Sequence, residues 1–179
     1  GRVTLLGGDD PRALRLNAIF GLKLPLGPYR SSDELGRIPA AFQAGTGAFD
    51  LLAGVSAWSV PARKLALSGA LVVRQPTTNP EGYRFGTSLL ATTDLRLDHL
   101  YPLSLTGGLR FNASTADHAP QLPEHGSGGV RLLGRIGAAL HAGESLVLNV
   151  DGLVPIVSGL AGDPLAPAFT LLAGATASY

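Results

Sequence analysis

The residues with the clearest chemical potential are charged side chains that alternate with apolar ones along the chain. In the segment LSLTGGLRFN at 103–112, Arg110 lies between Leu109 and Phe111. If such a segment is an extended strand, successive side chains point to opposite faces and the charges gather on one of them. The charged residues that fit this pattern are Lys23, Asp50, Lys64, Arg74, Arg84, Asp94, Arg96, Arg110, Arg131, Arg135 and Asp151.

Two roles remain open for this mainly basic set, which we expect to line the lumen of a closed sheet. Like charges between walls of low dielectric constant focus their electric field, so the set could line a channel or cavity for anionic or polarisable solutes. Alternatively, cations and carboxylates could pair as the filling of a narrow barrel. In both cases we expect a basic stripe beside Asp94 on three consecutive strands, formed by Arg84, Arg96, Arg110, Arg131 and Arg135.

Candidates for catalysis and metal binding are weaker. His125 and Ser127 in PEHGSGG could act as the pair of a lipid hydrolase, but Glu124 is the only nearby acidic residue that could orient the histidine. We therefore expect no catalytic residue and no enzyme activity. The histidines lack the close spacing of metal ligands, so we expect neither a metal nor a cofactor; they are His99, His118, His125 and His141.

The elements that would position the charges are long β-strands. The alternation is clearest at 83–97, 103–112 and 130–141, and weaker copies lie at 15–26, 45–59, 64–74, 145–157 and 169–179, with a possible ninth strand at 2–6. The eight main segments have 10 to 15 residues. A strand that crosses a bilayer needs roughly 9 to 11 residues, whereas strands of soluble proteins average roughly 5 to 6. The prediction is an all-β fold, an antiparallel transmembrane β-barrel of the outer-membrane type.

The expected connections alternate in length, as in outer-membrane barrels. Tight turns fall near 60–63, 98–101 and 142–144, and longer loops at 27–44, 75–82, 114–127 and 159–168. The terminal aromatic Tyr179 resembles the C-terminal assembly signal of such proteins and places the tight turns in the periplasm. Because bacterial barrels have even strand numbers, a ninth strand at 2–6 predicts that N-terminal strands are missing from this sequence.

Composition agrees with a cell-envelope protein. Hydrophobic residues make up 45% of the chain, yet no apolar run reaches the roughly 18 residues that a transmembrane helix needs. The sequence has no cysteine, which suits passage through an oxidising periplasm. A net charge of +1 gives no general attraction to nucleic acid, so no nucleic-acid partner is expected.

Several blocks, read in order, resemble a known family. They are GLKLPLG at 21–27, QAGTGAFDLLAGVSAW at 43–58, GYRFG at 82–86, SGG at 127–129 and the ending from Val154. Together they resemble the outer-membrane proteins of the meta-pathway of phenol degradation transporter-like family. The resemblance implies a single barrel domain over 1–179, about 12 strands in the complete protein, and uptake of aromatic or other hydrophobic molecules.

The leading functional hypothesis is therefore passive passage or uptake of small, hydrophobic or aromatic molecules through a barrel in the bacterial outer membrane. Its expected partners are membrane lipid and a small hydrophobic solute. A second hypothesis is a structural or interaction barrel with a filled lumen, whose long extracellular loops bind a protein partner or another copy of the chain. A third is a lipid-modifying barrel enzyme.

Overall fold

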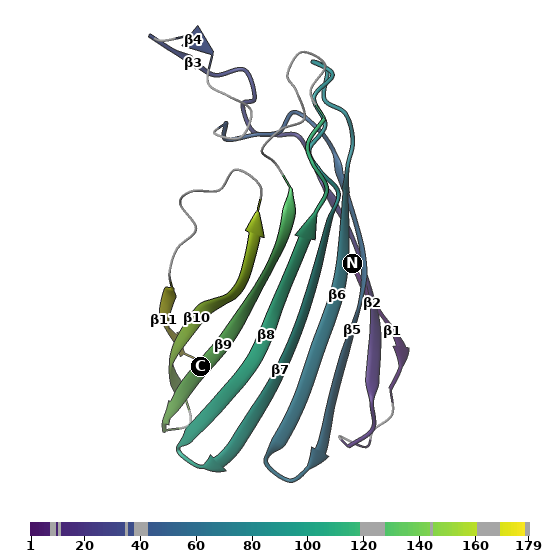
Figure 1. The fold of residues 1–179 in the computed structure, drawn as a ribbon. Helices are drawn as coiled ribbons and strands as arrows, with labels where there is room; N and C mark the ends of the chain where they lie inside the picture. The colour runs from purple at the N-terminus through teal and green to yellow at the C-terminus, as the bar shows by residue number, and fades with distance from the viewer. Residues whose placement is uncertain are drawn as a thin grey trace.

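The computed structural model describes residues 1–7, 10, 12–34, 36–37, 43–118, 128–143, 145–160 and 169–177. These residues form one antiparallel sheet of nine strands and a separate two-stranded sheet (Figure 1). The strands are β1 (Arg2–Leu6), β2 (Arg15–Lys23), β3 (Ser32–Asp33), β4 (Gly36–Arg37), β5 (Asp50–Ala62), β6 (Leu65–Pro76), β7 (Ser88–Leu100), β8 (Leu103–Ser114), β9 (Gly129–Ala142), β10 (Leu146–Leu160) and β11 (Thr170–Ala177). The described part of the chain has no helix, and so none that could cross a membrane.

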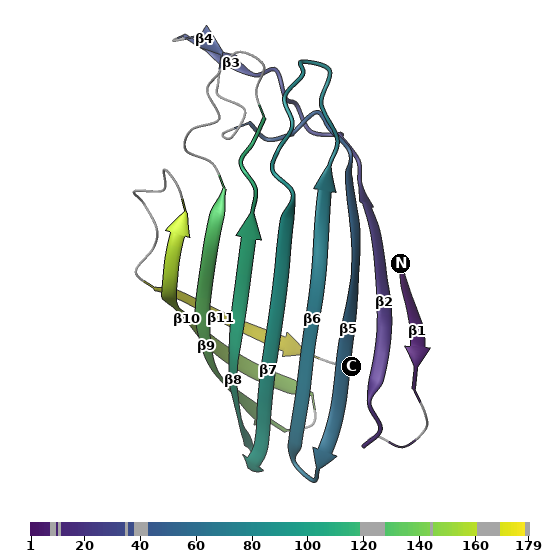
Figure 2. The same ribbon diagram turned by 45° about the vertical axis from the view of Figure 1, so that its right-hand side comes forward.

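The large sheet is an up-and-down meander, in which each strand pairs with its neighbour along the chain in the order β1-β2-β5-β6-β7-β8-β9-β10-β11 (Figure 2). Tight connections join β5 to β6, β7 to β8 and β9 to β10 at one end of the sheet, and the longer connections leave from the other end (Figure 1). The predicted all-β antiparallel fold is confirmed. Each predicted strand corresponds to a strand of the sheet.

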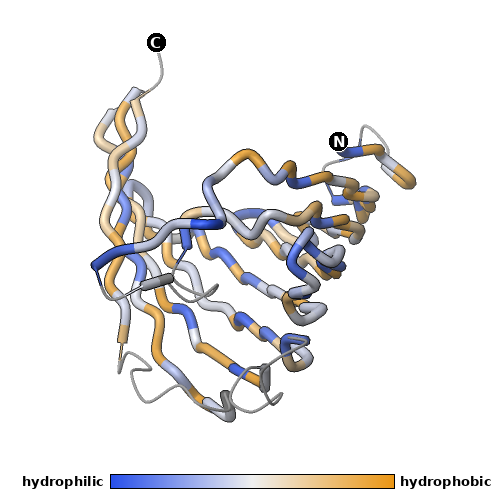
Figure 3. The backbone as a smooth tube through the Cα atoms, turned by 90° about the horizontal axis from the view of Figure 1, so that it is seen from above, coloured by the Kyte–Doolittle hydropathy of each residue, from blue (hydrophilic) through white to orange (hydrophobic). Residues whose placement is uncertain are grey.

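The sheet is not closed, because among the described residues β1 pairs only with β2, and β11 only with β10. Viewed from its end, the sheet is an arc with a gap between its two edge strands (Figure 3). All eight pairings are antiparallel, so β1 and β11 run in the same direction.

The register separates two faces of different chemistry. The apolar face includes Leu105 and Leu109 of β8, which stand opposite Ala138 and Gly134 of β9. It carries no Asp, Glu, Lys or Arg of the nine strands, and many of its large side chains are exposed, to 76% at Ile136. Six apolar residues of the alternating segments 103–112 and 130–141 share this face in the register, as alternation predicts: Leu103, Leu105, Leu109, Phe111, Leu132 and Ile136.

Two predicted wall residues lie outside the strands. Lys64 occupies the two-residue turn between β5 and β6, where its positive φ of 68° is a turn conformation rather than an extended one. Arg84 precedes β7, which begins at Ser88 rather than 83, and forms only an isolated bridge with His118. Neither residue therefore lies in the wall formed by the strands.

The start of β7 is late because the connection 77–87 is bonded to neighbouring connections. Tyr83 Oη donates a hydrogen bond to Asp117 Oδ2, and the Gly86 amide donates to Asp117 Oδ1 at 2.8 Å. Burial, followed by the bond to Asp117, raises the pKa of the Tyr83 phenol. On the other side, Asn79 Nδ2 donates to the carbonyl of Thr46 at 3.2 Å. The long connections at this end are therefore linked to one another.

A bulge interrupts β10, as Pro155 in the sequence suggests. The pairing of β9 with β10 shifts register between Pro155 and Val157. Proline has no amide hydrogen to donate to the ladder, so it favours such an irregularity. The strand continues beyond the bulge to Leu160, and the wall is not broken there.

Candidate functional site

The second face of the sheet, the polar face, carries every Asp, Lys and Arg of the nine strands. The basic residues outnumber the acidic ones, eight to four. They are Arg2, Arg15, Lys23, Arg74, Arg96, Arg110, Arg131 and Arg135, with Asp50, Asp94, Asp98 and Asp151. The same face also carries apolar side chains, among them Ile19, Leu52, Val72, Leu90 and Leu153.

The polar face is the concave one, since two hollows open on it that are lined by side chains from several strands. One of about 310 Å³ extends from Ser68 of β6 to Asp151 of β10. The other, of about 610 Å³, is lined by residues of β1, β2, β5, β6 and β7 around Trp58, and we call it the Trp58 hollow. A convex surface could not bring strands this far apart to one hollow.

Asp94, Arg135 and Asp151 line the first hollow. Together with Arg110 they form a cluster of four charges on four consecutive strands, which we call the central ion cluster. Arg135 Nη1 donates to Asp94 Oδ1 at 2.9 Å, and Arg135 Nη2 lies 2.7 Å from Asp151 Oδ1. Arg110 Nη2 lies 3.3 Å from Asp94 Oδ2. The two carboxylates thus balance the two guanidinium groups within one partly buried network.

Glycines on the polar face make room for this cluster. Gly108 stands between Asp94 of β7 and Arg135 of β9 in the register, so Arg135 reaches Asp94 across a strand that presents no side chain there. A Cβ at position 108 would clash with Asp94 Oδ1 and the Thr93 carbonyl, and one at Gly137 with Asp151 Oδ1. The cluster depends on these two close approaches.

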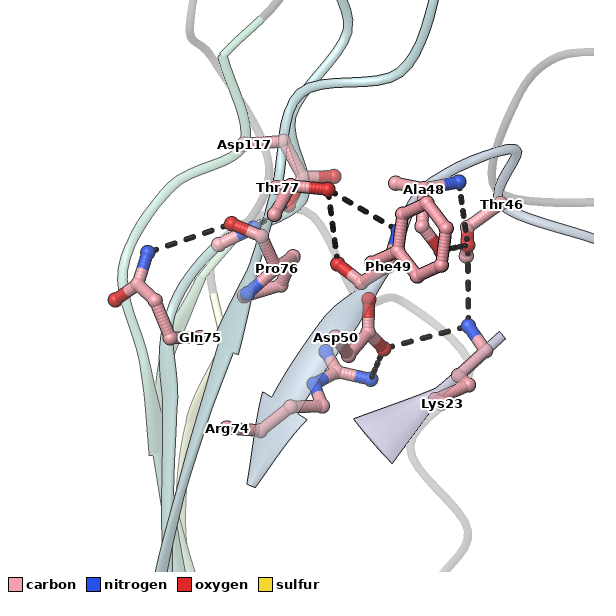
Figure 4. Close-up of polar contacts among 11 residues, drawn as sticks. Lys23, Thr46, Ala48, Phe49, Asp50, Arg74, Gln75, Pro76, Thr77 and Asp117 are labelled. Atoms are coloured by element: carbon pink, nitrogen blue, oxygen red, sulfur yellow. Dashed lines mark hydrogen bonds and ion pairs between the residues drawn. The ribbon is translucent and has the colours of Figure 1, made fainter. Parts of the chain in front are cut away.

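A second cluster lies at the end of the long connections and consists of Lys23, Asp50 and Arg74 (Figure 4). Asp50 is only 1% exposed, and its Oδ2 accepts from Lys23 Nζ at 3.3 Å and lies 3.8 Å from Arg74 Nη1. Lys23 Nζ also donates to Thr46 Oγ1 at 3.1 Å. Asp50 Oδ1 and Arg74 Nε are buried without a hydrogen-bond partner among the described residues. Two cations therefore face one incompletely bonded carboxylate.

A third cluster lies near the tight turns. Ser104 Oγ lies 3.1 Å from His141 Nε2, and Arg96 Nη2 donates to Ser104 Oγ at 3.4 Å. Arg96 Nε also donates to Asp98 Oδ1 at 2.8 Å. Ser104 and His141 thus connect β8 to β9. The serine is only 3% exposed, so its hydroxyl is not accessible to a substrate as a nucleophile.

The structure brings together most of the predicted set, but not in the predicted stripe. Asp94, Arg110, Arg135 and Asp151 meet, and Lys23, Asp50 and Arg74 meet separately. Arg96 is paired with Asp98 at the third cluster, Arg131 lies opposite Asn112 on the polar face, and Arg84 and Lys64 are outside the wall. The stripe of five arginines is therefore not formed.

Sequence reasoning missed two contacts of this face. Arg15, which it did not single out, places its guanidinium carbon 5.4 Å from the centre of the Trp58 ring, and Ser104 and His141 form the pair described above. Alternation places Ser104 and His141 on the polar side of their segments, but it does not show that they meet. Glu124, His125, Ser127 and Tyr179 lie outside the described residues.

No family model, curated protein or solved structure matches this chain. Among the described residues, no group of three His, Asp or Glu side chains is placed to hold a metal ion. The function is therefore inferred from the geometry of the two faces of the sheet.

Proposed function

We propose that this chain forms the wall of an outer-membrane β-barrel through which small molecules pass without an enzymatic step. The observation that supports this most strongly is the separation of the two faces. Every Asp, Lys and Arg of the nine strands is on the concave face, and large exposed apolar side chains cover the convex one. A protein in water would cover such an apolar surface with a second layer, whereas lipid solvates it directly.

Strand length and backbone pairing favour the same environment. β5 to β10 have 12 to 15 residues, more than the roughly 9 to 11 needed to cross the hydrocarbon region. A sheet can stay in lipid only if its edges are satisfied by closure. Since β1 and β11 run in the same direction, antiparallel closure needs an odd number of further strands. Three would give the expected total of 12.

The polar face is suited to a solute path by its hollows and its surplus of cations. The central ion cluster is balanced, but the face as a whole carries more basic than acidic residues. Apolar residues such as Leu52, Val72 and Leu90 lie among the charges. Such a mixed surface fits small molecules with an apolar body, the class implied by the family resemblance, and favours those that also carry negative charge.

A second candidate is a structural or interaction barrel with a filled lumen, and the central ion cluster is the observation that favours it. Arg135 binds carboxylates of both β7 and β10, so the cluster joins four strands and occupies space in the concavity. In that case the linked long connections would be the functional surface, where a partner protein or another copy binds.

The test is conductance of the full-length protein in planar bilayers. Passage predicts a steady conductance with anion selectivity, and the double variant Arg110→Ser and Arg131→Ser should shift that selectivity toward cations. Arg12→Ser, in the exposed turn before β2, is the matched control and should leave selectivity unchanged. A folded protein that neither conducts ions nor admits small solutes into proteoliposomes would contradict passage and favour the filled barrel.

A further inference from the structure

The Trp58 hollow combines an aromatic surface with hydroxyl and cationic groups. Its lining includes the Trp58 indole, the hydroxyl-bearing residues Ser56, Ser68 and Thr92, and Arg2. Arg15 stands directly opposite Trp58 in the pairing of β2 with β5, and its guanidinium carbon lies 5.4 Å from the ring centre. On the concave side of the sheet, Arg2 thus lines the hollow together with Trp58, and a second cation, Arg15, lies over the Trp58 ring.

Polar atoms at this place lack partners within the described chain. Arg15 Nε and Ser56 Oγ are both buried and have no hydrogen-bond partner among the described residues. None of the described carboxylates forms an ion pair with Arg2 or Arg15, whereas Arg110 and Arg135 are each paired in the central ion cluster. Buried donors without acceptors are costly, so an acceptor from outside the chain would be stabilised here.

We propose that the Trp58 hollow binds a small organic carboxylate with a flat apolar body. The carboxylate accepts hydrogen bonds from the guanidinium of Arg15 and is attracted by Arg2, and the flat body packs on the Trp58 indole. The hydroxyl groups of Ser56, Ser68 and Thr92 can donate to the remaining carboxylate lone pairs. This deepens the proposed passage and rests on it for the route by which the solute arrives.

The pattern of groups distinguishes this ligand from simpler ones. An uncharged hydrocarbon would cover the indole but leave the cations and the Arg15 Nε–H unpaired. An inorganic anion would pair with the cations but leave the indole uncovered. A carboxylate on a flat apolar body satisfies both parts of the hollow, whose volume of about 610 Å³ holds a molecule of this size.

The position of Trp58 provides a direct readout, because it is the single tryptophan of the sequence. The experiment titrates the folded full-length protein in detergent micelles with benzoate and follows tryptophan fluorescence. Benzamide, which keeps the flat body without the charge, and acetate, which keeps the charge without the flat body, are the matched probes. Benzoate should give a saturable change at a concentration at least about tenfold lower than either matched probe, a difference of ~1.4 kcal/mol.

Variants assign the binding to this hollow. Arg15→Gln should weaken benzoate binding about tenfold, the loss expected for one charge-assisted pair. Arg12→Gln, which changes an exposed basic residue in the turn before β2, outside the hollow, should leave benzoate binding within about twofold of that of the unchanged protein. Should Arg15→Gln fail to fold, Arg2→Gln on the edge strand β1 provides the same comparison, with an expected weakening of about threefold.

The outcomes separate this inference from the proposed passage. Equal responses to the three probes, or a benzoate response that neither arginine variant weakens, would overturn the binding site even if the barrel conducts. Specific benzoate binding by a barrel that neither conducts ions nor admits small solutes would support the site and contradict passage.

Discussion

Gly108 provides the sharpest test of how the central ion cluster is built. In Gly108→Ala the new methyl group meets Asp94 Oδ1 and the Thr93 carbonyl, so the Asp94 carboxylate must move away from Arg135. A charge-assisted hydrogen bond contributes roughly 1.5–3 kcal/mol. Its loss exceeds the ~0.5–1 kcal/mol that alanine gains over glycine within a strand. We therefore expect Gly108→Ala to lower the free energy of unfolding by about 1–2 kcal/mol.

The neighbouring glycine is a matched control. A Cβ at Gly107 has no atom within 4 Å, and it lies on the apolar face. Gly107→Ala should therefore be neutral or stabilise the protein by up to ~1 kcal/mol, so the two variants should differ by about 2 kcal/mol. The measurement is urea unfolding in lipid vesicles, followed by the fluorescence of Trp58. Equal free energies of unfolding for the two variants would refute the crowding at position 108 and the bond across β8.

Three further outcomes are expected. Asp50→Asn removes the carboxylate that, among the described residues, pairs with Lys23 and Arg74, and should lower the free energy of unfolding by about 2–4 kcal/mol in the same urea assay; an unchanged midpoint would contradict the buried pair. Tyr83→Phe removes the bond to Asp117 and should speed proteolysis of the long connections about fivefold. Because the pKa of Tyr83 is raised, the native phenol should protect these connections from neutral pH to pH 10 and lose its effect as the pH rises through that higher pKa; loss of protection between neutral pH and pH 10 would contradict this. Ile136→Arg places a charge on the apolar face and should cost about 2–4 kcal/mol in lipid, whereas a tolerated arginine would show that lipid does not contact this position.

The arrangement of the sheet was predictable because alternation with period two is a local property of the sequence. The strands at 103–112 and 130–141 were correct to within two residues at each end, and the parity of Arg110 and Arg135 placed both on the polar face. The alternation of short and long connections followed from the same pattern, although the observed turns begin one to three residues later than predicted. None of this required knowledge of which side chains meet.

The contacts between strands could not be predicted in the same way. The reach of Arg135 to Asp94 depends on Gly108 standing between them in the register, and register between strands is not visible in the sequence of either. The late start of β7 depends on Asp117, which binds Tyr83 and the Gly86 amide from a distant connection. Lys64 was predicted to be the first residue of a strand. It instead belongs to the two-residue turn between β5 and β6, and β6 begins at the next residue, Leu65.

A membrane-spanning barrel wall requires that the apolar face of the sheet contacts lipid and that the polar face contacts water. Because the sequence contains no cysteine, single cysteines at each position from 103 to 112 of β8 can carry a nitroxide label without background. In lipid vesicles, collision with oxygen should peak at Leu103, Leu105, Gly107, Leu109 and Phe111, and collision with a water-soluble nickel complex should peak at the positions between them. Oxygen collision rates without a period of two along β8, or with maxima at Ser104, Thr106 and Arg110, would contradict the membrane-spanning barrel wall.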